Sequence, residues 1–582
     1  MCGVSGITTP DRDLVLRMSH ALSHRGPDAS DVFVDDRVAI AHERLRIIDL
    51  SDGGAQPRVH HRHVLSFNGE IYNYIELRKE LESEGVAFET RSDTEVFLRA
   101  YERWGVECFG RFNGMWAAAI YDRKDGSILL SRDRLGQKPL YYVEGRSDSE
   151  PGLAFASQIR ALQQLGELDT RRVEALAEYF TYGFVPEPAT WFERIRAVPA
   201  AHHVRWRPGA GLAAPERYWT LEGDLARPAE ADLIDELDSL LTDALRLRQR
   251  ADVPVGLFVS GGLDSTGIAS LLPPGWTGLH VALDAAETRL VRSFARDSDA
   301  RLVVRTAREY DYDAELPRIM REFDQPFADN SSIPTYWICR EAAAQGLKVM
   351  LSGEGGDELF FGYERYGRLR LFEQIGNRSW VRAMHAFSER VSPGGSIEKG
   401  LRFLGKHSLR DYYLKLRGGF TPDEWPRLFT PEYLDQLRDF DPYEPFEAHW
   451  PDRDWPIAKC AQWFDWATNF PCDILAKVDR MSMAHSLEVR SPFLDHRLYE
   501  WAARLHPDVL FAGESKRLYK RWLRPRIPRR FLNQPKRGFG LNVDVDLAER
   551  LPPEIRPGAR EWLAQEKKIF FANALASIQR EN

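Results

Sequence analysis

Residues 255–265 read Val-Gly-Leu-Phe-Val-Ser-Gly-Gly-Leu-Asp-Ser, and they decide the fold of the larger part of the chain. The first five form a short apolar run typical of a buried strand, and an apolar helical stretch at 267–272 follows the glycine pair. A strand, a glycine loop and a helix N-terminus make an anion cradle, because unpaired N–H groups and the helix dipole point at the ligand. No Gly-Lys-Ser/Thr follows, so the loop is not a Walker A motif.

Strand and helix patterns alternate on both sides of this loop. Leucines recur at helical spacing over 233–247, and strand candidates follow at 279–283, 302–305 and 348–351. Strands that alternate with helices predict a parallel α/β sheet. A second glycine-acid loop, residues 351–360 (LSGEGGDELF), directly follows one of these strands. Residues 455–525 read as mostly helical.

The first 165 residues have a different, strand-rich texture. Short apolar or alternating segments occur at 38–48, 64–67, 116–121 and 128–132, and helical patterns interrupt them at 74–85 and 94–104. Prolines and a Gly-Ala-Gly run punctuate residues 170–225, which therefore read as a connection. The texture predicts two domains, 2–215 and 228–582.

Composition limits the class of protein. The chain has 582 residues, 43% of them hydrophobic and 29% charged, with a net charge of −8. A negative net charge disfavours a protein that binds nucleic acids or anionic membranes nonspecifically. No apolar run approaches the roughly 18 residues of a membrane span. Residues 1–6 show no basic segment followed by an apolar one, so no signal peptide is expected. Five scattered cysteines without a Cys-x-x-Cys pair predict neither a disulfide framework nor a structural zinc site. The predicted compartment is the cytoplasm.

Cys2 follows only the initiator methionine. If Met1 is removed, this residue carries both a thiol and an α-amine that titrates near about 8, so nucleophile and base lie on one residue. A lone cysteine is more often a small apolar packing residue.

The segments around Cys2 change that balance. Residues 24–28 (HRGPD), 42–49 (HERLRIID), 68–73 (NGEIYN) and 92–95 (SDTE) occur in order, and 136–142 (GQKPLYY) extends the pattern. Together they resemble the class II glutamine amidotransferases of the asparagine synthetase family. The resemblance implies an α+β N-terminal nucleophile (Ntn) sandwich domain, followed by an α/β parallel-sheet ATP-pyrophosphatase domain with a helical C-terminal part.

The resemblance also implies roles for single residues. Cys2 would attack the side-chain amide of glutamine, and the Asn68 side chain and Gly69 N–H would stabilise the oxyanion. Asn68-Gly69 could instead form only a hairpin turn, and Arg44 could be a surface charge. The residues that the resemblance assigns to glutamine binding are Arg44, Ile47, Ile48, Asn68, Gly69, Glu70 and Asp93.

The second site is predicted at the two glycine loops. The SGGLDS run at 260–265 resembles the pyrophosphate loop of ATP pyrophosphatases, and 473–480, 483–490 and 491–495 match the same family. Asp264 and Asp357 are the predicted Mg²⁺ ligands, because hard oxygen donors suit this ion; alternatively, Asp357 and Glu358 only cap a helix. The predicted ATP-binding residues are Val259, Ser260, Gly261, Gly262, Asp264, Ser265, Ala282, Ser352 and Gly353.

Residues 516–537 hold ten basic residues and no acid. Such a run is usually solvated or faces nucleic acid, but the family places a phosphate-contacting lysine here. Lys520 fits that lysine best and Lys516 second.

The resemblance implies two active sites in series. Glutamine is hydrolysed at Cys2, and ATP with Mg²⁺ adenylates a carboxylate near Glu354, which ammonia then converts to an amide. β-Lactam-forming relatives carry tyrosine at the position of Glu354 and lack the cysteine. L-Aspartate is the leading acceptor, although Asn330 stands where the family has an arginine for the substrate carboxylate. A sugar acid or another specialised carboxylate, and more remotely tRNA modification, are the alternatives. The resemblance leaves a homodimer open and implies no nucleic-acid or membrane partner.

Overall fold

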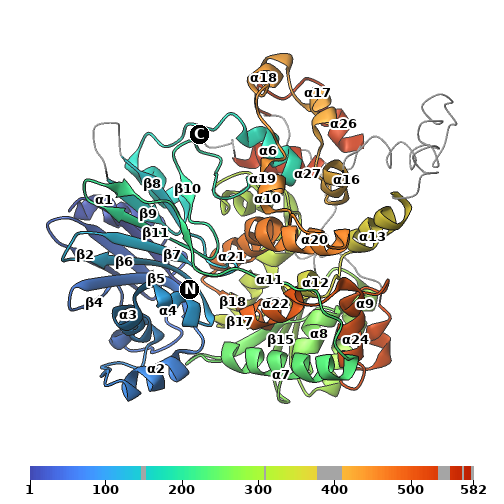
Figure 1. Cartoon of the computed structure of the whole chain (residues 1–582), viewed down its shortest axis with the longest axis horizontal. Coiled ribbons are helices and arrows are strands. Elements are labelled where there is room, and N and C mark those ends of the chain that lie inside the picture. The colour runs from blue at the N-terminus through green and yellow to red at the C-terminus, as the bar shows by residue number, and fades with distance from the viewer. Residues whose placement is uncertain (146–151, 307–309, 377–408, 535–550, 566–568, 579–582) are drawn as a thin grey trace.

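The computed structural model describes residues 1–145, 152–306, 310–376, 409–534, 551–565 and 569–578. Two parts lie side by side, and the N-terminus lies where they meet (Figure 1). The first part is a sandwich of two antiparallel sheets, and the second is built on one parallel sheet with a large helical region. In the portion described, no helix combines the length and the apolar character that crossing a bilayer needs. The predicted fold class is confirmed.

The sandwich has a six-stranded sheet in the order β10-β8-β9-β1-β3-β2 and a seven-stranded sheet ordered β12-β11-β7-β6-β5-β4, with β13 paired to β11. Apolar side chains such as Val4, Ile40, Ala119 and Phe155 fill the space between the sheets. The strands are β1 (Gly3–Ile7), β2 (Ala29–Val34), β3 (Ala39–Arg44), β4 (Arg58–His60), β5 (His63–Ile71), β6 (Gly114–Asp122), β7 (Ile128–Arg132), β8 (Tyr141–Glu144), β9 (Leu153–Ala156), β10 (Arg196–Ala197), β11 (His202–Arg207), β12 (Gly211–Leu212) and β13 (Glu216–Arg217).

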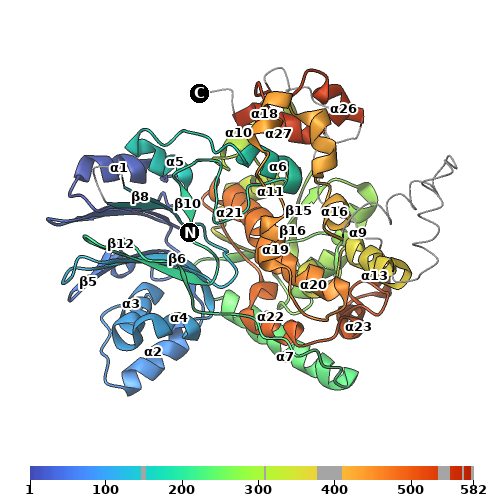
Figure 2. The same ribbon diagram turned by 45° about the horizontal axis from the view of Figure 1, so that its top comes forward.

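Helices cover the outer face of each sheet (Figure 2). α1 (Arg12–His20) and α5 (Ile159–Leu162) pack on the sheet that contains β1, and α2 (Tyr74–Ser83) and α3 (Asp93–Trp104) pack on the other. α3 begins where the Ser92 hydroxyl accepts the Glu95 N–H (3.2 Å), so the Ser-Asp-Thr-Glu motif is also a helix start.

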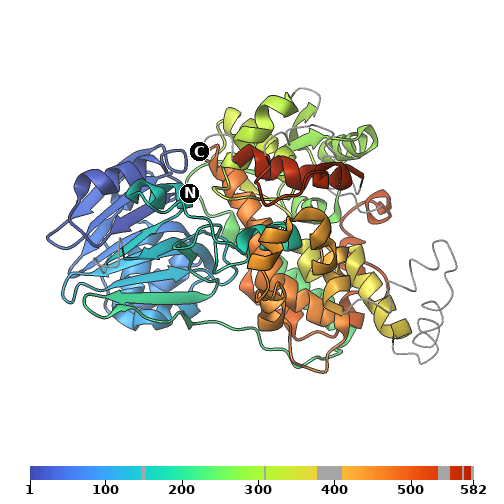
Figure 3. The same ribbon diagram turned by 90° about the horizontal axis from the view of Figure 1, so that it is seen from above.

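The interpretation of residues 170–225 as a simple connection is wrong. β11 is an interior strand that pairs with β7, because Val204 and Trp206 alternate with polar residues, while the prolines lie outside it. α6 (Ala175–Tyr182) leaves the sandwich and packs against Phe420 and Phe571. Figures 1 and 3 show this helix, in teal, among the helices of the second part.

The parallel sheet has the order β16-β15-β14-β17-β18. β14 pairs with β15 on one side and with β17 on the other, so the strand order reverses at this point. The loops after β14 and β17 therefore meet at the switch point where open α/β sheets bind ligands. The predicted strands are all present, and β18 within the helical stretch was missed. They are β14 (Val255–Phe258), β15 (Thr277–Ala282), β16 (Arg301–Thr306), β17 (Val349–Leu351) and β18 (Glu488–Arg490).

The helices that matter for the site surround this sheet. α20 (Ile457–Phe464) continues through the π-helical segment Asp465–Leu475 into α21 (Ala476–Met483) as one long element. The others used below are α7 (Glu230–Arg248), α8 (Leu263–Ala269), α9 (Ala285–Asp297), α11 (Ser332–Ala344), α16 (Leu409–Leu416), α24 (Arg517–Leu523) and α27 (Ile569–Ile578).

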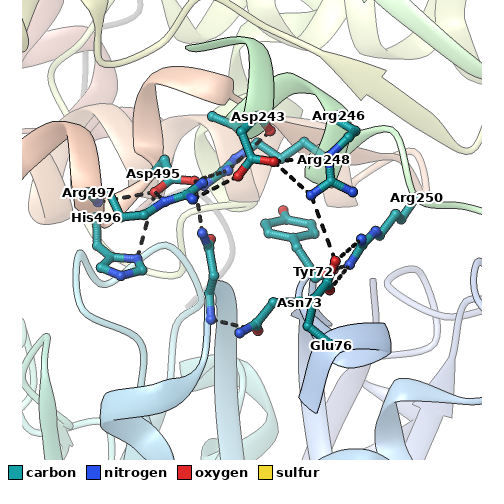
Figure 4. A network of polar contacts seen from close by, with 12 residues as sticks. Tyr72, Asn73, Glu76, Asp243, Arg246, Arg248, Arg250, Asp495, His496 and Arg497 are labelled. Carbon is teal, nitrogen blue, oxygen red and sulfur yellow. Dashed lines mark hydrogen bonds and ion pairs between the residues drawn. The ribbon is translucent and has the colours of Figure 1, made fainter. Parts of the chain in front are cut away.

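A polar network joins the two parts (Figure 4). Arg250 donates to both Glu76 oxygens (2.5 Å each), and the buried Arg248–Asp495 pair lies at 3.0 Å. Asn113 Nδ2 from the sandwich donates to Asp495 Oδ2 (2.9 Å). The Arg250–Glu76 and Asn113–Asp495 bonds cross the interface and help hold the two parts in one arrangement.

Candidate functional site

Cys2 directly precedes β1, beside the junction of the two parts. Its N–H donates to Asn68 Oδ1 (2.9 Å) on β5 of the opposite sheet. Its side chain is buried, and burial raises the pKa of the thiol to about 11 with Met1 attached. The Met1 ammonium is also buried, 3.7 Å from the Glu488 carboxylate of β18.

The predicted oxyanion residues occupy the interior of β5. Asn68 Nδ2 is buried and has no hydrogen-bond partner among the described residues, so this donor is available to a ligand. Gly69 has φ 153°, and a Cβ there would lie 2.7 Å from Trp116 Cα and collide with the Met115 carbonyl. Both residues pair with β6, so the hairpin-turn alternative is wrong.

Arg44 is a buried side chain and not a surface charge. Its Nη atoms donate to the carbonyls of Ser51 (2.8 Å) and Asp49 (2.5 Å). Ile47 and Ile48 pack against Val349 of the second part, and the Ile47 carbonyl accepts the Asp252 N–H (2.9 Å). These residues thus line the side of the sandwich that faces the parallel sheet.

Glu70 and Asp93 form a buried acid pair. Burial raises the pKa of both carboxyls, that of Asp93 to about 6, and the Asp93 charge raises the pKa of Glu70 further. Two buried neighbouring carboxyls favour keeping one of them protonated when no cation is bound. An α-ammonium group can take that proton's place. Arg490 of β18 lies 3.6 Å from Glu70.

The two glycine loops of the second part touch. Ser265 Oγ accepts the Ser260 N–H (3.0 Å), which closes the loop between β14 and α8. A Cβ on Gly353 would lie 2.8 Å from Asp264 Cβ, so the loop after β17 packs directly on the first. The Gly261 N–H donates to Glu287 of α9 (2.9 Å), and a phosphate must displace that carboxylate to reach it.

The remaining predicted ATP-binding residues lie at the same edge of the sheet. Val259 follows β14, Ala282 ends β15, and Ser352 follows β17, with its Oγ buried and lacking a hydrogen-bond partner in the described chain. Gly262 precedes α8, whose first turn carries Asp264.

Asp264 and Asp357 converge on one ammonium group, and that group belongs to Lys516. Lys516 Nζ contacts Asp264 and lies 2.8 Å from Asp357 Oδ1. Burial alone would lower the pKa of Lys516, but the two carboxylates hold it above its ordinary value. Lys520 instead pairs with Glu514 (3.0 Å) near the surface. The preference for Lys520 is therefore not supported by the geometry, which favours Lys516.

The rest of the basic tract pairs largely within the fold. Arg517 and Arg521 contact Glu230, and Arg526 contacts Asp238. Residues 535–537 of the tract lie outside the described residues.

Glu354 lies beside a lysine that sequence reasoning did not single out. Lys477 of α21 donates to Asp329 Oδ2 (2.8 Å) and Ser331 Oγ (2.7 Å), and its charge acts on Glu354. Burial raises the pKa of Glu354. The motif at 473–480 contains Lys477, so a signal was present.

Arg25 is the second residue that sequence reasoning missed. Its Nε donates to the Cys2 carbonyl (3.1 Å), and its Nη atoms form a bidentate pair with Asp479 of α21 (2.9 and 3.0 Å). One guanidinium thus links the backbone of Cys2 to the helix that carries Lys477. Its signal was the His-Arg-Gly-Pro-Asp motif.

The carboxylates of Asp264 and Asp357 are suited to binding Mg²⁺. No group of three or more metal-ligating side chains occurs in the ranges that the structure covers. Two carboxylates that face one cation are nevertheless the donor set Mg²⁺ uses when phosphates and waters complete its shell.

Comparisons with known proteins agree with this geometry. A family model for a glutamine amidotransferase domain matches residues 1–219, and one for asparagine synthase matches 236–581. Asparagine synthetase (glutamine-hydrolyzing) 1 of Bacillus subtilis (strain 168) is 31% identical, over 100% of this chain and 91% of its own. Asparagine synthetase (glutamine-hydrolyzing) 3 of the same organism is 28% identical, over 97% and 89%.

Among solved structures, a Bacillus subtilis glutamine phosphoribosylpyrophosphate amidotransferase aligns with 52% of this chain and 81% of its own, at 16% identity. Its TM-score of 0.30 is too low to carry weight. The full-length relatives and the two family models carry the assignment: this chain belongs to the glutamine-hydrolysing asparagine synthetase family, a carbon–nitrogen ligase with a glutamine amidotransferase domain.

Proposed function

We propose that the chain converts L-aspartate to L-asparagine, using glutamine as the nitrogen donor and ATP as the activating substrate. The observation that supports this most is the placement of two chemically different sites on either side of one interface. Cys2 and Asn68 lie on the sandwich side, and the Asp264–Lys516–Asp357 group lies at the switch point of the parallel sheet.

The first half-reaction requires removal of Met1. The α-amine of Cys2 then takes the thiol proton, and the thiolate attacks the glutamine amide carbon. Asn68 Nδ2 and the Gly69 N–H hold the oxyanion, ammonia leaves, and water hydrolyses the thioester to glutamate. Glu70 and Asp93 hold the α-ammonium of glutamine, and Arg44 reaches its α-carboxylate once it gives up a loop carbonyl.

The second half-reaction activates the acceptor, because a carboxylate is a poor electrophile. The acceptor carboxylate attacks the α-phosphorus of ATP, and diphosphate leaves. Asp264 and Asp357 would hold Mg²⁺, which neutralises phosphate charge when bound. Lys516 stabilises the departing diphosphate, and ammonia then displaces AMP from the acyl carbon.

The test is diphosphate release with ATP, Mg²⁺ and ammonium over a panel of carboxylates. We expect L-aspartate to react best, with asparagine as product. If a sugar acid reacts best, the ligase chemistry stands and aspartate is wrong; if no carboxylate reacts, the proposed chemistry fails.

A further inference from the structure

The acceptor side of the second site lacks the expected arginine, since Asn330 occupies its position. The stretch that carries it, residues 327–335, is nonetheless held in the site. Asp329 and Ser331 bind Lys477, and Lys477 acts electrostatically on Glu354. Residues 327–335, which we call the acceptor stretch, and Glu354 thus both face Lys477.

Another buried arginine lies beside this stretch. Arg417 follows α16, and its side chain is only 8% exposed. Its Nη2 bonds to Asn469 Oδ1 and lies 3.7 Å from Asp473 Oδ2, and its guanidinium packs over Phe184 at 5.6 Å. Asn469 and Asp473 both belong to the π-helical segment, a geometry that is rare and concentrated at functional sites.

Two independent connections place Arg417 at the acceptor stretch. Lys477, four residues after Asp473 on the same continuous helix, donates to Asp329 (2.8 Å). On the other side, the Gly183 carbonyl next to Phe184 accepts the Ala328 N–H (2.8 Å). Arg417 is therefore enclosed by segments that each contact residues 328–329.

One donor and one acceptor remain unused there. Arg417 Nη1 and Asp473 Oδ1 are both buried, and neither has a hydrogen-bond partner within the described part of the chain. Burying such groups unsatisfied is costly, so this donor and this acceptor are available to a ligand that enters between them. A cationic donor beside an anionic acceptor is complementary to a zwitterion, whose carboxylate accepts and whose ammonium donates.

We propose that Arg417 and Asp473 bind the α-carboxylate and α-ammonium of an amino-acid acceptor, whose side-chain carboxylate is then adenylated near Glu354. This inference rests on the proposed function and narrows it to acceptors with an amino-acid head group. Arg417 supplies, from the helical region, the arginine that position 330 lacks.

The experiment measures diphosphate release with ATP, Mg²⁺ and saturating ammonium. Three acceptors are compared: L-aspartate, succinate (no ammonium) and β-alanine (no α-carboxylate). Arg417→Met is expected to raise the KM for L-aspartate about ten- to hundredfold, with a much smaller effect on kcat. Its effect on β-alanine should be small, because that acceptor has no carboxylate for Arg417 to bind.

Two further variants serve as controls. Arg417→Lys should restore part of the loss, because it keeps the charge but not the two-pronged geometry. Lys415, near the end of α16, pairs with Glu424 (3.4 Å) and not with Asn469 or Asp473. Lys415→Met should leave the KM for all three acceptors unchanged. Thermal unfolding of each variant reports whether it folds.

The outcomes separate the inference from the proposed function. An unchanged aspartate KM in a folded Arg417→Met protein overturns the inference and leaves the function intact. Equal use of succinate and aspartate by the unmodified enzyme also overturns it. If none of the acceptors in the wider panel supports diphosphate release, the proposed function itself fails.

Discussion

At the scale of single residues, motifs indicated which side chains to consider, and the structure shows where those side chains lie. Asn68 and Gly69 were assigned from a motif, and β5 holds them where only glycine fits at position 69. The sequence favoured Lys520 over Lys516, because it could not show that Lys516 lies just before α24, at its N-cap, and not within the helix. The geometry favours Lys516, which lies between two carboxylates, whereas Lys520 pairs with Glu514 near the surface.

Replacement of Cys2 tests the first site. Cys2→Ala should abolish glutamine-dependent turnover and leave ammonium-dependent turnover close to normal, since nucleophile and oxyanion residues act only on glutamine. Diphosphate release with either nitrogen source measures both. Intact mass should show that active enzyme begins at Cys2. Loss of both activities in a folded variant would mean that the two sites are misassigned.

The paired lysines test the second site. Lys516→Met should reduce ammonium-dependent diphosphate release at least about a hundredfold, because it removes a preorganised charge at the departing diphosphate. Lys520→Met is the matched control, and its release rate should change by less than about threefold. Equal effects of the two substitutions would refute the assignment of Lys516.

At the scale of elements, periodicity predicted the strands β3, β5, β6, β7 and β14 to β17 and missed others, among them β11 and β18. β11 was hidden in a proline-rich stretch, although its apolar residues alternate, and β18 is three residues long inside a helical region. The π-helical segment was not predictable, because a local helix pattern does not specify which carbonyl each N–H reaches. It nevertheless places Asn469 and Asp473 at the acceptor side.

α20 contains a lysine that makes stability depend on pH. Lys459 is fully buried and donates to Gln462 Oε1 (3.0 Å) and the Ala502 carbonyl (2.8 Å). Burial lowers its pKa to about 7. Between this value and about 10.4 in the unfolded chain, the unfolded state binds more protons, so stability rises with pH across that window.

The Lys459→Met variant should lose this pH dependence. We expect a higher melting temperature than the unmodified protein at pH 7, with the difference narrowing towards pH 10. The substitution should remove a pH dependence of the free energy of unfolding that is on the order of 1 kcal/mol per pH unit. Thermal unfolding at several pH values measures it, and parallel curves for the two proteins would show that Lys459 is charged in the fold.

At the scale of the molecule, the docking of the two parts could not be predicted from the sequence. Arg25 and Asp479 are separated by 454 positions, yet they form a buried bidentate pair behind Cys2. Glu70 and Arg490 also approach across the interface. Pairings of this kind depend on how two folded parts dock, which no local pattern encodes.

Breaking the Arg25–Asp479 pair should uncouple the sites. Asp479→Asn leaves a buried guanidinium without its counter-charge, at a cost of about 3–5 kcal/mol. We expect a lower melting temperature and more glutamate formed per diphosphate than in the unmodified enzyme. The exposed pair Arg111–Glu80 (2.6 Å), which lies within the sandwich, offers a control, and Glu80→Gln should leave that ratio unchanged. An unaltered ratio in Asp479→Asn would show that the pair has no part in coupling.

The most direct measurement follows a nitrogen atom between the sites. Glutamine labelled with nitrogen-15 at its side-chain amide is supplied with ATP, Mg²⁺, the acceptor and an excess of unlabelled ammonium. Serial action of the two sites predicts that the amide product carries the label despite the competing pool. An unlabelled product alongside labelled free ammonia would contradict it.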